Sequence, residues 1–283
     1  MPPGPAGREV TALTPRSTEH RRTALAAYPD PGAPADRVIR GQGTPSAEWL
    51  SWPGWAGLRV TGVAGLVPPG SRLVVVAPHP DDEILAAGGL LAAAARAGRD
   101  LLLVAVTDGQ ASHPGSEKWP EEDLAAHRRQ ETADALEVIG AGAAGVRRLG
   151  LPDGGLAART AALTSTLAGL LVASDVVVSP WRFDGHPDHE AAGYATALAA
   201  RGRGARHLEA PVWAWHWAAP GDPRVPWPRA CVLYLGPILA QRKRAAIGCF
   251  TSQLEPDPST GAGPVLPPWA VARFRHGREV FFR

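Results

Sequence analysis

The fold is decided by residues 72–109, which read RLVVVAPHPDDEILAAGGLLAAAARAGRDLLLVAVTDG. Residues 73–77 are a short apolar run rich in valine, which is typical of a parallel strand buried on both faces. Residues 84–97 are rich in alanine and leucine and stop at Gly98, as a helix does. Residues 101–107 form a second apolar run that ends before Asp108-Gly109. The stretch therefore predicts a strand, a helix and a second strand.

The alternation of strands and helices continues to residue 200. We expect helices over residues 121–139, 156–173 and 190–200, and strands over residues 146–151 and 175–179. Such a β-α-β-α series predicts an α/β fold with a doubly wound, mostly parallel, Rossmann-like sheet.

The pattern changes after residue 206, where we expect additional C-terminal strands. These are a strand over residues 211–217, a strand over 231–235, a helix over 238–247, and a terminal strand or hairpin over 272–282. Tryptophans alternate with other residues in the segment 211–217, at positions 213, 215 and 217. Because a strand that presents tryptophan at every second residue usually buries it, we expect packing rather than sugar stacking.

The N-terminal residues have a different character. Residues 1–45 are rich in Pro, Gly, Ala and Arg without sustained periodicity, so we expect an irregular extension with a short helix near residues 18–27. One domain then follows over residues 46–283. Trp49, Trp52 and Trp55 predict a hydrophobic clasp that closes the extension onto this domain.

Composition excludes several classes of protein. The net charge is +2, from 29 basic and 27 acidic residues, so no charged field attracts nucleic acid or an anionic membrane. Charged residues interrupt any N-terminal signal sequence, and the apolar runs are too short to span a bilayer, so we expect a soluble, cytoplasmic protein. Two cysteines cannot build a thiolate metal cage. Any metal site must therefore use histidine and carboxylate.

Polar side chains gather where the first strand ends, in the motif His79-Pro80-Asp81-Asp82-Glu83. In open α/β sheets, ligands bind in the crevice beyond the carboxyl ends of the strands. The spacing of His79 and Asp82 lets both reach one metal ion, while Asp81 points elsewhere and can handle a proton. The alternative is structural, with Asp81 capping the following helix and Asp82 and Glu83 complementing its dipole.

A matching motif, His186-Pro187-Asp188-His189, follows the strand expected over residues 175–179. Its two histidines, three residues apart, lie at the same edge of the same expected sheet. They can complete a His-Asp-His site with three protein ligands and one open position, which is the pattern of catalytic zinc.

Together, the two motifs resemble those of the PIG-L/LmbE-like zinc-dependent N-deacetylases. These include de-N-acetylases of glucosaminyl-phosphatidylinositol, of mycothiol precursors and of glycopeptide antibiotics. The resemblance covers residues 72–255 and is supported by weaker matches at Thr107-Asp108-Gly109, at residues 128–131 and 151–154, and at Ser252-Gln253. The chain departs from the family pattern at Gln110, where glutamate is usual, at Asp184-Gly185, where some relatives have a tyrosine, and at residues 249–251, where a histidine is common.

The resemblance implies a zinc-dependent hydrolase that removes an N-acyl group, with acetyl expected, from an amino sugar or sugar conjugate. It makes His79, Asp82 and His189 the zinc ligands, with Fe²⁺ or Co²⁺ as alternatives to zinc. It makes Asp81 the general base that deprotonates zinc-bound water. His186 becomes the cationic acid or the electrophile beside the reacting carbonyl.

Three further residues are candidates for contact with the substrate. The resemblance gives Arg128 and Asp153 a substrate-side or architectural role. His113 lies on the loop after the second strand, where it contacts substrate or is simply solvated. The expected partner is a small N-acylated molecule, and the sequence leaves the oligomeric state open.

Other functions fit the same sequence. One is a zinc amidase that acts on a non-sugar amide or a thiol conjugate, and another is a non-catalytic relative that binds a ligand. A flavin or dinucleotide oxidoreductase is disfavoured, because the first strand leads into His-Pro-Asp-Asp and not into a glycine-rich phosphate loop.

Overall fold

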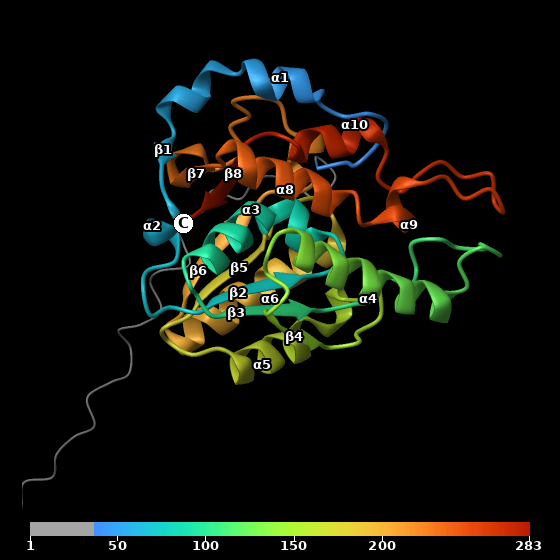
Figure 1. Ribbon diagram of the computed structural model, residues 1–283, viewed down its shortest axis with the longest axis horizontal. Coiled ribbons are helices and arrows are strands. Elements are labelled where there is room, and N and C mark those ends of the chain that lie inside the picture. The colour runs from blue at the N-terminus through green and yellow to red at the C-terminus, as the bar shows by residue number, and fades with distance from the viewer. Residues whose placement is uncertain (1–36) are drawn as a thin grey trace, which may run out of the picture. The chain divides into compact units, whose positions relative to one another are not determined.

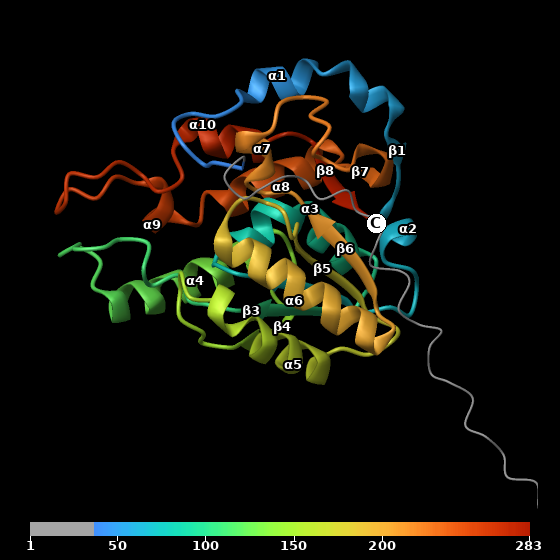
Figure 2. The same ribbon diagram turned by 180° about the vertical axis from the view of Figure 1, so that it is seen from behind.

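The strands lie in one mixed sheet with the order β1-β7-β8-β6-β5-β2-β3-β4. The structure is a computed structural model and describes residues 37–283. The helix expected near residues 18–27 and most of the N-terminal extension lie outside the described residues. Helices cover both faces of the sheet, with α3, α4 and α8 in front in Figure 1 and α5 and α6 in front in Figure 2.

The five consecutive strands from β6 to the edge strand β4 are parallel, which confirms the doubly wound α/β prediction. They are β2 (Leu73–Ala77), β3 (Leu101–Ala105), β4 (Gly145–Arg148), β5 (Val176–Pro180) and β6 (Arg206–Ala210). The helices that connect or follow them are α3 (Asp82–Arg96), α4 (Glu121–Val138), α5 (Thr160–Leu170) and α6 (Pro187–Arg203). The chain runs outward from β2 through β3 to β4, then returns to β5 on the other side of β2. This reversal makes the β2/β5 pair the topological switch point, where α/β proteins bind ligands.

The two faces of β2 explain its continuous apolar sequence. Leu73, Val75 and Ala77 pack in the cluster that includes residues of α3 and α8. Val74 and Val76 pack on the other face with residues of α5 and α6. Because both faces are buried, β2 shows no polar alternation, and its bounds are those expected from the sequence.

The C-terminal part adds β7 (Ala230–Tyr234) and β8 (Arg278–Phe282) to the sheet. Strand β8 pairs antiparallel with both β6 and β7, and the short β1 (Arg59–Val60) pairs parallel with β7. The remaining helical elements are α1 (Ser46–Ser51), η2 (Pro53–Gly57), α2 (Val63–Leu66), η3 (Ala157–Arg159), α7 (Ala214–Trp217), η4 (Trp227–Arg229), α8 (Pro237–Ile247), α9 (Thr251–Leu254), α10 (Pro268–Val271) and η5 (Ala272–Phe274). Among the described residues, none of the helices combines the length and apolar character needed to cross a bilayer.

Three expectations for secondary structure need correction. The strand predicted over residues 211–217 is wrong, because α7 occupies its second half. The carboxylate of Asp184 accepts the backbone N–H groups of residues 212, 213 and 214, which fixes the start of a helical turn. Of the terminal strand or hairpin expected over residues 272–282, the strand is observed, but it is shorter than expected, because residues 272–274 form a helical turn and β8 begins at Arg278. Helix α6 begins at Pro187, three residues earlier than expected, because proline suits the first helical position.

The tryptophans of the predicted clasp pack on the domain as expected, whereas most of the extension that they were expected to close onto it lies outside the described residues. Trp49 is buried, and its Nε1 donates to the carbonyl oxygen of Trp215 over 2.9 Å. The Trp49 and Trp215 ring centroids lie 4.9 Å apart, and those of Trp52 and Trp227 lie 4.5 Å apart. The tryptophans of the segment 211–217 pack in hydrophobic clusters, as expected.

Helix α3 is interrupted at Ala87, which has φ −143° and ψ 16°. Glu279 of β8 accepts the free N–H groups of Gly89 and Leu90 over 2.6 and 2.8 Å. Lys243 of α8 donates from Nζ to the carbonyl oxygen of Leu85 and to Glu279. A buried ion pair therefore replaces helical hydrogen bonds at this break.

Replacement of Glu279 by glutamine should lower the free energy of unfolding by about 3–5 kcal/mol, because it leaves the Lys243 ammonium buried without a counter-charge. Urea unfolding followed by circular dichroism measures the change. The control is Glu255→Gln, which removes an exposed partner of Lys118 and should change stability by less than about 0.5 kcal/mol. Equal, small losses in both variants would contradict the assigned role of the pair.

Candidate metal centre and active site

The candidate site lies at the switch point, where β2 and β5 end side by side. The two strands pair in register, with Leu73 opposite Val176 and Val75 opposite Val178. The loop after β2 carries His79 into α3, and the loop after β5 carries His186 into α6. Motifs more than 100 residues apart in the chain therefore meet at one sheet edge, as the sequence predicts.

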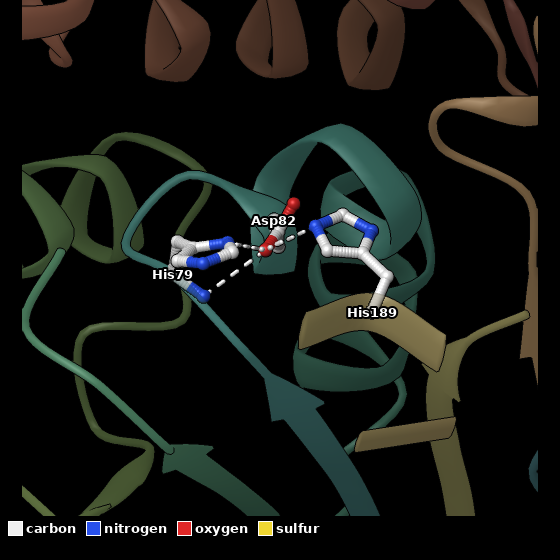
Figure 3. Close-up of side chains that lie close together, drawn as sticks. All are labelled: His79, Asp82 and His189. Carbon is white, nitrogen blue, oxygen red and sulfur yellow. Dashed lines mark hydrogen bonds and ion pairs between the residues drawn. The ribbon is translucent and has the colours of Figure 1, made fainter. Parts of the chain in front are cut away.

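His79, Asp82 and His189 bring one ligand atom each within 4.8 Å of the others. Asp82 Oδ2 lies 3.2 Å from His79 Nδ1 and 3.2 Å from His189 Nε2, and Figure 3 shows the two rings on either side of this carboxylate. His189 Nε2 is buried and makes no hydrogen bond in the described part of the chain. Two imidazole nitrogens and one carboxylate oxygen fit a catalytic zinc ion.

Charges within this triad stabilise one another despite burial. Burial disfavours ionised Asp82, but the positive charges of His189 and His79 outweigh it and hold its pKa below the usual range. Burial also lowers the pKa of His189, but Asp82 and Asp184 raise it to about 9. A metal ion would take the place of the imidazole protons, so its affinity should fall as the pH falls.

The other ring nitrogen of His79 faces two carboxylates. Nε2 lies 3.2 Å from Asp153 Oδ1 and 3.4 Å from Asp188 Oδ2. Asp188 is itself fixed by the N–H groups of Gly154 and Leu156. His79, Asp153 and Asp188 also bring ligand atoms within 4.8 Å of one another. They do so through Nε2 of His79, whereas Nδ1 is the nitrogen that lies beside Asp82. Asp153 therefore contacts the second nitrogen of a candidate ligand, the position at which an acceptor orients a metal-bound imidazole.

Asp184 holds His189 in the same way, a role that the sequence analysis missed. Its Oδ2 lies 2.8 Å from His189 Nδ1, and its side chain is fully buried. The same carboxylate accepts the N–H groups at the start of α7. The available signal was a carboxylate two residues before the His-Pro-Asp-His motif, since a metal-bound imidazole needs an acceptor on its second nitrogen.

Asp81 lies beside the triad in an unusual backbone conformation, with φ 117°. Its side chain makes no capping hydrogen bond to α3, so the structural alternative of a helix cap is not observed. Oδ2 instead lies 3.0 Å from Nη2 of the buried Arg128 on α4. Burial raises the pKa of Asp81 well above its usual value, although Arg128 opposes the rise. Arg128 therefore contacts the candidate base.

His186 completes the histidine cluster. Its ring centroid lies 5.1 Å from that of His79 and 4.8 Å from that of His189, and Trp213 lies nearly parallel to it at 6.4 Å. Nδ1 accepts the N–H of Asp188, so the ring proton sits on Nε2. Burial and the positive charges of His189 and His79 lower the pKa of His186 to about 3, which favours the neutral ring.

His113 is less closely tied to this cluster. Its Nδ1 lies 2.9 Å from Ser112 Oγ, and Ser112 also accepts from Gln253. In residues 37–283, His113 makes no direct contact with the three candidate ligands. The neighbouring Ala111 donates its N–H to Asp153 Oδ2, so this loop is anchored at the edge of the site.

Comparison with known proteins identifies the family of the central part of the chain. The family model PIG-L, described as GlcNAc-PI de-N-acetylase, matches residues 74–200. This segment belongs to the PIG-L family. It runs from β2 to α6 and contains the three candidate ligands, Asp81, Arg128, Asp153 and His186. A search of the curated proteins found no match.

Solved structures with the same fold include two deacetylases. The antimicrobial reagent A40926 pseudoaglycone deacetylase Dbv21 is 22% identical, with a TM-score of 0.56, and the match covers 75% of this chain and 96% of that one. The zinc-inhibited form of the teicoplanin deacetylase Orf2 is 20% identical, with a TM-score of 0.53, over 65% and 85% of the two chains. Together with the family match, these structures support a PIG-L deacetylase fold.

Proposed function

We propose that this protein is a zinc-dependent hydrolase that removes an N-acyl group, with acetyl expected, from an amino sugar or sugar conjugate. The observation that carries the proposal is the convergence of His79, Asp82 and His189 at the switch point of a PIG-L segment. The teicoplanin and A40926 deacetylases share the fold, which supports a small sugar-containing substrate.

A zinc ion held by these residues would acidify a water molecule and polarise the substrate carbonyl. Asp81 would accept the proton of the attacking water, because it lies next to a ligand in the chain but outside the triad. Arg128 holds the carboxylate of Asp81 through its 3.0 Å contact, which limits the positions that this base can adopt.

His186 would act as the electrophile beside the reacting carbonyl. With Nδ1 occupied by the N–H of Asp188, its Nε2–H can donate to the carbonyl oxygen as negative charge develops there. The parallel ring of Trp213 restricts the orientation of His186. Asp81, once protonated, can return its proton to the departing amine, which completes the hydrolysis without a further acid.

Purified protein should contain about one equivalent of zinc per chain, and dialysis against a chelator should abolish hydrolysis, with recovery when zinc is restored. Elemental analysis and release of acetate from a panel of N-acetylglucosamine conjugates test this directly. A parallel panel of simple acyl-amines and thiol conjugates separates a sugar deacetylase from a general amidase. Full activity after metal removal would contradict the proposal.

A further inference from the structure

Asp81 is held at three points by the residues around it. Its carbonyl oxygen accepts the N–H groups of Ile84 and Leu85 over 3.0 and 2.9 Å, in the first turn of α3. Its carboxylate contacts Arg128, and its own N–H donates to Oε2 of Glu83 over 3.0 Å. The carbonyl, the carboxylate and the N–H of one residue are therefore all engaged, in a backbone conformation that an L-residue rarely adopts.

Glu83 restrains the backbone of Asp81. The Glu83 side chain is fully buried, so its bond to the Asp81 N–H is shielded from water. A glutamate in the first turn of a helix often bonds back to an N-terminal N–H, and such a contact by itself only stabilises the helix. Here, however, the N–H belongs to the candidate base, at φ 117°. The bond therefore restrains the torsion that directs the Asp81 carboxylate.

Arg128 restrains the Asp81 side chain through a guanidinium that three oxygen atoms hold. Nη2 donates to Asp81 Oδ2 over 3.0 Å and to the carbonyl oxygen of Pro80. Nη1 donates to the carbonyl oxygen of Gly109 over 2.8 Å. Arg128 is only 2% exposed. Because a guanidinium is planar and its donors are fixed in direction, these contacts hold the carboxylate in one orientation.

Gly109 leaves the space that this guanidinium occupies. Its φ is +66°, and a Cβ atom at this position would lie 2.0 Å from Nη1 and 2.5 Å from Cζ of Arg128. Both distances are far below van der Waals contact, so an alanine here would displace the guanidinium that contacts Asp81. The Gly109 loop cannot easily retreat, because Thr107 donates from Oγ1 and from its N–H to the carbonyl oxygen of Pro78.

We propose that Glu83 and Gly109 are positioning residues for the base Asp81. Glu83 sets its backbone, and Gly109 admits the guanidinium that orients its carboxylate. Both act through Asp81 rather than on the substrate. These roles rest on the proposed function, because they serve the base of that hydrolysis.

Gly109→Ala is compared with Gly150→Ala in the full-length, zinc-loaded protein. Gly150 also has a positive φ, of +61°, but in the described part of the chain a Cβ atom there meets no atom within 4 Å beyond its own chain neighbours. The two substitutions therefore impose similar backbone strain, and only the first displaces Arg128. We expect kcat to fall at least about 10-fold in Gly109→Ala, with KM within about two-fold and zinc content unchanged. In Gly150→Ala, kcat should stay within about two-fold of the unmodified protein.

A double-mutant cycle assigns the effect to Arg128. In an Arg128→Ala background the guanidinium is absent, so the addition of Gly109→Ala should lower kcat by less than about a further two-fold. Equal kcat in Gly109→Ala and Gly150→Ala would overturn the role of Gly109. An undiminished further loss in the Arg128→Ala background would also overturn it.

Glu83→Gln is compared with Glu83→Leu to separate positioning from packing. Glutamine keeps an oxygen that accepts the Asp81 N–H, whereas leucine fills similar space without an acceptor. We expect kcat within about three-fold of the unmodified protein in Glu83→Gln and at least about 10-fold lower in Glu83→Leu, with zinc content unchanged in both. Glu83→Ala makes the same comparison if Glu83→Leu does not fold. Equal kcat in the variants with and without the acceptor would reduce Glu83 to a helix cap and overturn its role.

Failure of these roles is distinguishable from failure of the proposed function. If the unmodified zinc-loaded protein hydrolyses none of the N-acyl substrates, the proposed function is wrong, and the positioning roles are wrong with it. If the unmodified protein is active and the variants match their controls, the function stands and the positioning roles alone are overturned. Circular dichroism of each variant checks that the fold is intact.

Discussion

Replacement of Asp81 by asparagine should reduce turnover by about 10²- to 10⁴-fold while the protein keeps its metal. Asparagine has a similar shape, but its amide cannot accept the proton of the attacking water. The three candidate ligands remain in place, because Asp81 is bound to Arg128 and lies outside the triad. Steady-state kinetics combined with elemental analysis of the same preparation measure both quantities.

The control for this experiment is Asp134→Asn, the same chemical change at an exposed position of α4, which should leave turnover within about two-fold of the unmodified protein. Full activity in Asp81→Asn would show that another group is the base. Loss of metal together with activity would instead show that Asp81 supports the metal centre.

Replacement of His189 by alanine should weaken zinc binding by more than about 100-fold, since it removes one of only three protein ligands. Asp184→Asn should have a smaller effect, of about 10- to 100-fold, because it alters the acceptor that orients His189 but removes no ligand. Competition with a chromophoric chelator gives the zinc affinity of each variant, and thermal unfolding of the metal-free proteins gives their stability.

The variant Glu209→Gln is a control that distinguishes a loss of zinc affinity from a loss of folding stability. Glu209 is as deeply buried as His189 and pairs with Arg182, which is not one of the candidate ligands. This variant should lose stability without loss of zinc affinity. If Asp184→Asn and Glu209→Gln have the same zinc affinity as the unmodified protein, Asp184 has no role in holding the metal ligand.

The parallel half of the fold was predictable because its determinants are local. The run of valines in β2 and the glycine after α3 mark their elements without reference to distant residues. The segment 211–217 was not predictable in this way. Its helical turn depends on the carboxylate of Asp184, nearly 30 residues earlier in the chain. The alternating tryptophans of the segment do not indicate this distant contact.

The candidate site also contains some features that the sequence predicts and others that depend on tertiary packing. The positions of His79, Asp82 and the two histidines of the second motif at two strand ends were sufficient to group them, because parallel strands end at a common edge. The family resemblance then selected His189, and not His186, as the third candidate ligand. The contacts of Asp153 with His79 and of Arg128 with Asp81 depend on how separate loops and helices pack. Only the family resemblance singled those residues out, and it did not identify their partners.

The backbone of Asp81 has a consequence for any attempt to make this protein more robust. Among residues 37–283 it is the one position other than glycine with a positive φ, and an L-residue there costs about 1–2 kcal/mol. Glycine would relieve that cost, so selection for heat resistance alone would favour it. The same change would delete the candidate base. Folding stability therefore favours glycine at position 81, whereas catalysis requires aspartate. Substitutions that raise thermal stability should be sought at other positions.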